Sequence, residues 1–98
     1  MKNILLVSQD LDLAEKIKVI LEPKGFAVLR ENTPQGARDY LACHHQQTQF
    51  VFYDADVAKG EGMDILLELK DLYPGVPIIT ATALRAENQD QDNKEHLQ

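Results

Sequence analysis

Three aspartates follow two short apolar runs in positions that could build one acidic site. Asp54 comes directly after the apolar run Phe50–Tyr53, Asp56 lies two residues further on, and Asp10 lies three residues after the run that ends at Val7. If both runs are parallel strands, their carboxyl ends share one edge of a sheet, where ligands usually bind. A cluster of carboxylates there could hold a hard divalent cation. The alternative is that Asp10 and Asp12 cap a helix while Asp56 faces solvent.

The other polar clusters give weaker signals. Cys43, His44 and His45 are adjacent, so on a helix they point in different directions, whereas helical metal ligands need spacings of three or four. We therefore expect a solvated helix end there. Gly60 and Gly62 belong to a loop that lacks the glycine patterns of phosphate cradles. Because no catalytic triad or activated nucleophile stands out either, we do not expect an enzyme.

Length, charge and composition limit the classes of protein that fit. The 98 residues suffice for one domain, and 44% hydrophobic residues can form a packed core. A formal charge of -6 repels phosphate backbones, so direct binding of nucleic acid is not expected. A single cysteine cannot form an internal disulfide, which fits the reducing cytoplasm. The run Ile4–Val7 is too short for a signal peptide or for a membrane span of about 20 residues.

The elements that must position the aspartates alternate between strands and helices. Continuous apolar runs predict buried strands at Asn3–Val7 and Phe50–Tyr53. A fourth strand is expected at Pro77–Thr82, and Phe26–Glu31 is expected to be a half-covered edge strand. Three helices are expected between the strands. The first is capped by Asp10 or Asp12 and ends at Pro23 and Gly25, and its apolar face is formed by Leu13, Ile17, Ile20 and Leu21. The second runs from Thr33-Pro34 to about His45, and the third, Met63–Leu72, follows the loop Ala55–Gly62. This alternation predicts a parallel sheet with helices on both faces.

Four segments occur at a characteristic spacing. They are Ile4–Val7 as a first strand, Phe50–Asp54 as a third strand ending in aspartate, Gly62 eight residues later, and Pro77–Ala83 as a strand ending in a hydroxyl residue followed by alanine. In these features the chain resembles the receiver domain of bacterial two-component response regulators over residues 1 to about 84. The resemblance implies a flavodoxin-like three-layer α/β sandwich with four parallel strands in the order 2-1-3-4, lacking the terminal βα unit.

The resemblance also implies roles for particular residues. Asp54 would be the phosphoacceptor that attacks a phosphohistidine or a small phosphodonor, and Thr82 would contact the phosphoryl group and act as the switch. Mg²⁺ would be held by an acidic pair after the first strand, by the phosphoacceptor and by the carbonyl of Asp56. The expected partner is a sensor histidine kinase or another signalling protein.

The departures from the family pattern concern the charge around this site. Ser8 and Gln9 stand where the family has its acidic pair, so Mg²⁺ binding should be weakened. The remaining candidate metal ligands are Asp10, Asp54 and Asp56. The sequence also ends before the fifth strand, so the lysine that the family places after that strand is absent.

Two functional interpretations follow from these matches and departures. The chain is expected to be a receiver module of a phosphorelay, and the alternative is a phosphorylation-independent pseudo-receiver that acts in protein interaction or dimerisation. A fragment of a longer regulator is a third possibility. Residues 1–83 are expected to form the receiver-like domain and residues 84–98 a polar C-terminal tail or helix. An open fourth strand predicts a homodimer that buries this strand or the tail.

Overall fold

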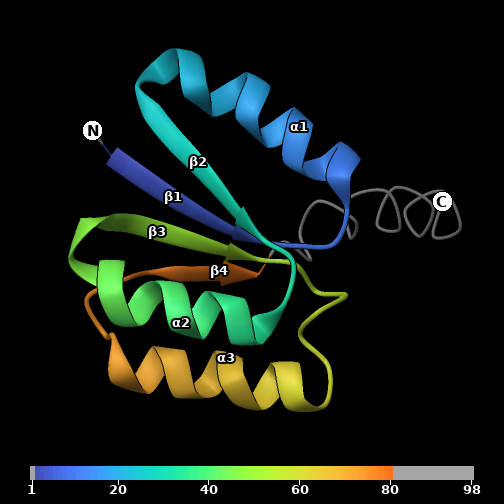
Figure 1. Cartoon of the computed structure of the whole chain (residues 1–98), viewed down its shortest axis with the longest axis vertical. Coiled ribbons are helices and arrows are strands. Elements are labelled where there is room, and N and C mark those ends of the chain that lie inside the picture. The colour runs from blue at the N-terminus through green and yellow to red at the C-terminus, as the bar shows by residue number, and fades with distance from the viewer. Residues whose placement is uncertain (1, 81–98) are drawn as a thin grey trace, which may run out of the picture.

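A four-stranded parallel sheet forms the centre of the fold in the computed structural model, which describes residues 2–80 (Figure 1). Its strands are β1 (Lys2–Val7), β2 (Phe26–Glu31), β3 (Thr48–Tyr53) and β4 (Ile78–Thr80). They are hydrogen-bonded in the order β2-β1-β3-β4, with every neighbouring pair parallel. The predicted 2-1-3-4 order and three-layer α/β architecture are confirmed. The predicted site residue Thr82, the boundary at residue 83 and the tail 84–98 lie outside the described residues.

Helices cover both faces of this sheet. Helix α1 (Leu11–Leu21) packs on one face, while α2 (Pro34–His44) and α3 (Glu61–Leu72) pack side by side on the other (Figure 1). Two single 3₁₀ turns, η1 (Glu22–Lys24) and η2 (His45–Gln47), follow α1 and α2. No helix within residues 2–80 is both long and apolar enough to cross a membrane.

The helix starts follow from the capping residues in the sequence. The Asp10 carboxylate accepts a hydrogen bond from the backbone N–H of Leu13 at 3.1 Å, so Asp10 rather than Asp12 caps α1. The Thr33 hydroxyl oxygen accepts one from Gly36 N–H at 3.0 Å, and Pro34 takes the first position of α2. Because each cap satisfies an amide that the helix leaves unpaired, each fixes the residue at which its helix begins.

Alternation along the strands divides the core between the two faces. Leu5 and Val7 of β1 lie in the cluster packed against α2 and α3, whereas Leu6 packs against Ala14 and Ile17 of α1. The same parity governs β3, whose register aligns β1 Val7 with β3 Tyr53. The residues that follow these two, Ser8 and Asp54, therefore leave the sheet side by side at its carboxyl edge.

Several element boundaries differ from the sequence prediction by a few residues. Helix α3 begins at Glu61 rather than Met63, after Gly60 with a φ of +52°. A glycine tolerates that left-handed backbone angle, and the chain can therefore turn into the helix earlier than the apolar pattern indicates. Strand β3 begins at Thr48, and the described part of the fourth strand ends at Thr80.

Candidate functional site

Asp54 lies directly beyond β3 at the carboxyl edge of the sheet. Its backbone N–H donates to the carbonyl oxygen of Val7 at 2.9 Å, which continues the β1–β3 ladder by one more hydrogen bond. Only 1% of the residue is exposed, so its carboxylate is held inside the edge of the fold. A buried carboxylate has to be matched by hydrogen-bond donors, and the site is built from those donors.

Ser8 supplies the first of these donors. Its hydroxyl donates to Asp54 Oδ2 at 2.7 Å and accepts from the backbone N–H of Asp10 at 3.0 Å, and Ser8 is 0% exposed. Because the Asp10 amide donates to the hydroxyl oxygen, the hydroxyl hydrogen is directed at the carboxylate. This bond joins residues 46 positions apart in the sequence.

The loop after Asp54 supplies a second donor. The backbone N–H of Asp56 donates to Asp54 Oδ1 at 3.1 Å, and Val57 N–H donates to the Asp54 carbonyl at 3.0 Å. This side-chain-to-backbone turn holds the carboxylate plane from the loop side. The side chain of Asp56 is itself exposed. Both carboxylate oxygens of Asp54 are thus oriented by neighbouring groups, one from each end of the site.

The loop is held against the sheet by a close backbone approach at Gly62. A Cβ at this position would overlap the carbonyl oxygen of Val57 and come within 3.2 Å of Pro34 Cγ. The Tyr53 hydroxyl donates to the Gly62 carbonyl at 2.7 Å, and burial raises the pKa of Tyr53 to about 12. Gly62 matches the family pattern in the sequence, whereas the sequence indicates for Tyr53 only a place in the core. A buried tyrosine needs a partner for its hydroxyl, and this was the signal available in the sequence.

The described residues do not fit a tightly held Mg²⁺. Ser8 and Gln9 bring no negative charge, and Asp10 has one carboxylate oxygen on the first turn of α1. Within residues 2–80, no group of three or more His, Cys, Asp or Glu side chains is arranged to hold a metal ion. The Asp10–Asp54–Asp56 metal site therefore stays a prediction.

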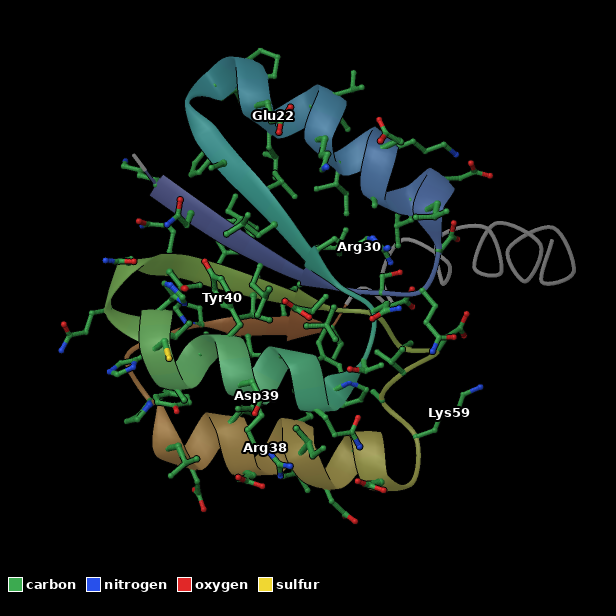
Figure 2. The ribbon with its side chains drawn as sticks, viewed as in Figure 1. Glu22, Arg30, Arg38, Asp39, Tyr40 and Lys59 are labelled. Atoms are coloured by element: carbon green, nitrogen blue, oxygen red, sulfur yellow. The ribbon has the colours of Figure 1, made fainter. Side chains whose placement is uncertain are left out.

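Arg30 of β2 reaches the same edge and was not singled out from the sequence. Its Nη1 donates to the carbonyl oxygen of Ser8 at 3.0 Å, and the residue is half-buried. Figure 2 shows Arg30 near the end of β2, beside the start of α1. The backbone N–H of Ser8 in turn donates to the Glu31 carbonyl at 3.0 Å, so Ser8 is fixed to β2 through both of its backbone polar groups.

The histidines at the end of α2 are directed away from one another. The ring of His44 stacks on Tyr40 with centroids 4.5 Å apart, while the ring of His45 stacks on Tyr73 at 4.7 Å. Each Nδ1 lies within 3.1 Å of the carbonyl oxygen four residues earlier. Cys43 is exposed. Ring stacking and helix-end hydrogen bonds account for these side chains.

Comparison with known proteins finds solved structures that are similar to this fold. No protein-family profile matches the sequence, and no curated protein sequence matches it. Among solved structures, a response regulator receiver domain protein from Clostridium thermocellum matches with a TM-score of 0.70 and 26% identity over 82% of this chain. The MaeR response regulator bound to beryllium trifluoride matches the same share of this chain with a TM-score of 0.66 and 29% identity. These matches support the identification of the chain as a response regulator receiver domain.

The chain spans somewhat less than two thirds of each of these matched structures, 64% and 66% respectively. Within residues 2–80, the predicted phosphoacceptor Asp54 directly follows β3. Ser8 and Gln9, which stand where the family has its acidic pair, directly follow β1 at the same carboxyl edge of the sheet. Of these, the structure brings Ser8 and Asp54 into direct contact, while Gln9 is exposed. Thr82 cannot be compared because it follows the last described residue.

Proposed function

We propose that the chain is a receiver module of a two-component phosphorelay in which Asp54 accepts the phosphoryl group. The observation that carries this proposal is the placement of Asp54 one residue beyond the central strand β3, with both carboxylate oxygens oriented by hydrogen bonds. Phosphoryl transfer depends mainly on positioning and on stabilising charge, and a preoriented carboxylate meets the first need. The beryllium trifluoride bound to the MaeR regulator adds support, since this group mimics a phosphoryl group.

The proposed step is a substitution at phosphorus. One carboxylate oxygen of Asp54 forms a bond to phosphorus while the bond from phosphorus to the donor nitrogen or oxygen breaks, and the leaving group takes that electron pair. The product is an acyl phosphate, and its negative charge needs hydrogen-bond donors around it. The Ser8 hydroxyl and the Asp56 amide already donate to this carboxylate, and they are placed to stay with it through the transfer. Thr82 is proposed to contact the phosphoryl oxygens.

A second candidate function rests on the burial of the same carboxylate. Asp54 is 1% exposed, and the Ser8 hydroxyl occupies Oδ2 at 2.7 Å, so the resting site is closed to a phosphodonor. A receiver that stays in this state would be a phosphorylation-independent interaction module. The two functions differ in whether the Ser8–Asp54 contact opens when a donor or its mimic is supplied.

Beryllofluoride in the presence of Mg²⁺ separates these two functions. The proposal predicts chemical-shift changes in the amides of Asp54, Asp56 and Ser8 that saturate with beryllofluoride, and no such changes in the Asp54→Asn variant. Asn keeps the size of the side chain and removes its charge, so the variant is a matched control. If the wild-type spectrum does not change even at saturating Mg²⁺ and beryllofluoride, the phosphoacceptor role is wrong and the interaction module remains.

The proposed partners are a sensor histidine kinase and a second copy of the chain, in the cytoplasm. Strand β4 is the last strand of the described sheet on its side, and Ile79 in it is 46% exposed. An uncovered edge strand offers backbone groups for pairing with an identical edge. Light scattering at micromolar concentration should therefore report a dimer. A mass that stays monomeric up to high micromolar concentration would contradict self-association.

A further inference from the structure

The side chain of Arg30 carries a permanent positive charge, and a single residue, Ser8, connects it to the proposed phosphoacceptor Asp54. Ser8 links Arg30 and Asp54: its carbonyl oxygen accepts from Arg30 Nη1 at 3.0 Å, and its hydroxyl donates to Asp54 Oδ2 at 2.7 Å. We propose that Arg30 is a binding residue for the phosphoryl group on Asp54 and supplies there part of the positive charge that a divalent cation would otherwise bring. The site then binds a phosphoryl group or its mimic without a metal ion. This inference rests on the proposed function of Asp54.

The β1–β2 register directs Arg30 toward the α1 face of the sheet. Arg30 is aligned with Leu6, which packs against α1, whereas the neighbouring Glu31 is aligned with Val7 on the opposite face. The carboxylate of Glu31 lies beside Gly36 at the start of α2, where an added Cβ would touch Glu31 Oε1. The acidic neighbour of Arg30 in the sequence is therefore directed to the other side of the sheet.

The chemistry of the guanidinium suits this role. A guanidinium stays protonated under all ordinary conditions and presents five N–H donors in a planar fork. The bond to Ser8 uses one of these donors and anchors the group at the carboxyl edge. Because Arg30 is half-buried rather than fully enclosed, its remaining donors can turn to an oxyanion that arrives from solvent.

The neutral residues at positions 8 and 9 leave this charge available. Two carboxylates at these positions would offset a guanidinium, and a divalent cation would then be needed to make the edge positive again. Ser8 and Gln9 carry no charge, so the positive charge of Arg30 is not offset from those positions. Asp10 is nearby in the sequence, and its Oδ1 is bonded to the Leu13 amide in the first turn of α1.

Lys59, a cation in the loop that follows Asp54, is less suited than Arg30 to bind the phosphoryl group. Lys59 belongs to the loop between β3 and α3, but it is exposed and its side chain extends away from the fold (Figure 2). Arg30, by contrast, is anchored at the carboxyl edge by its hydrogen bond to the Ser8 carbonyl. Arg30 is thus connected by a hydrogen bond to Ser8, which in turn donates to Asp54.

The test is a beryllofluoride titration followed by ¹⁹F and amide NMR, once in buffer stripped of divalent cations and once with Mg²⁺. Wild-type protein should bind in both buffers with similar affinity. Arg30→Gln keeps a donor for the Ser8 carbonyl but removes the charge, and should weaken metal-free binding by about tenfold or more, as expected for the loss of a charge-assisted contact in a partly solvated site. Arg30→Lys keeps the charge and should retain most of the affinity.

Arg38→Gln is the matched control, because it makes the same change in net charge as Arg30→Gln but lies away from Asp54. Arg38 of α2 contacts Glu68 of α3 at 3.5 Å, on the helical layer away from the site (Figure 2). This variant should bind as the wild type does. Equal binding by Arg30→Gln and the wild type, or a loss shared by Arg30→Lys and Arg30→Gln, would show that Arg30 has only a structural role.

The two buffers distinguish a failure of this inference from a failure of the proposed function. If the wild type binds beryllofluoride with Mg²⁺ but not in the stripped buffer, Asp54 remains a phosphoacceptor and the metal-free role of Arg30 is wrong. If it binds in neither buffer, both are wrong. Binding in the stripped buffer that Arg30→Gln loses and Arg30→Lys keeps supports the assignment.

Discussion

Removal of the Ser8 hydroxyl should destabilise the domain through the buried carboxylate of Asp54. In Ser8→Ala the hydrogen bond of 2.7 Å to Oδ2 and the bond of 3.0 Å from the Asp10 amide are both lost. The Asp10 amide lies at the exposed start of α1, where water can replace its partner, whereas Asp54 is 1% exposed. Most of the cost therefore falls on the carboxylate.

The expected size of this effect follows from hydrogen bonds to charged groups. Such a bond contributes about 1.5 to 3 kcal/mol, so Ser8→Ala should lower the free energy of unfolding by about 2 kcal/mol. In a domain of this size, that loss corresponds to a fall in Tm of roughly 8 to 16 °C. Urea unfolding followed by circular dichroism at neutral pH measures the free energy, and a thermal scan measures the Tm.

Two controls make this prediction specific to the Ser8–Asp54 contact. Gln9→Ala changes the adjacent exposed residue and should alter the free energy of unfolding by about 0.5 kcal/mol or less. In the Asp54→Asn background, where the partner is neutral, Ser8→Ala should cost less than it does beside the carboxylate. A Ser8→Ala variant as stable as Gln9→Ala, or an equal cost in both backgrounds, would refute the reasoning.

Three further outcomes are expected. Gly62→Ala should lower the free energy of unfolding by about 1 to 3 kcal/mol, because its Cβ overlaps the rigid Val57 carbonyl; a neutral result in urea unfolding would contradict the close approach. The free energy of unfolding should fall as pH rises from about 10 to 12, since unfolded Tyr53 ionises before folded Tyr53, whose pKa is raised to about 12; this contributes a loss of about 3 kcal/mol, and Tyr53→Phe should remove that part of the fall. The double change Ser8→Asp, Gln9→Asp should strengthen Mg²⁺ binding by roughly tenfold or more in calorimetry, and unchanged binding would show that charge at these positions does not limit the metal.

The fold could be predicted from the sequence because its signals are local. The continuous apolar run Ile4–Val7 is fully buried, as expected for a central strand, and Thr33-Pro34 starts α2 where a cap and a first-turn proline should. Asp54 could be placed at the site because it directly follows such a run. These conclusions depend on the residues within one segment and need no knowledge of how segments are aligned.

The partners of Asp54 could not be predicted in the same way. Ser8 was noted in the sequence as the loss of a carboxylate, and its bond to Asp54 depends on the β1–β3 register, which brings two residues 46 positions apart together. In the sequence, Arg30 is one charged residue of an expected edge strand. Only the β1–β2 register shows that it reaches the Ser8 carbonyl. Register is set by packing across the sheet, which a single sequence does not display.

The most direct test of the central claim is phosphorylation of the intact protein by acetyl phosphate. Wild-type protein and Asp54→Asn would be incubated in parallel, with Mg²⁺ present, and examined by intact-mass spectrometry followed by borohydride trapping and peptide mapping. Our account predicts that the wild type gains the mass of one phosphoryl group on the peptide that contains Asp54, and that the variant gains none. Absence of the gain in the wild type, or an equal gain in both proteins, would contradict Asp54 as the phosphoacceptor.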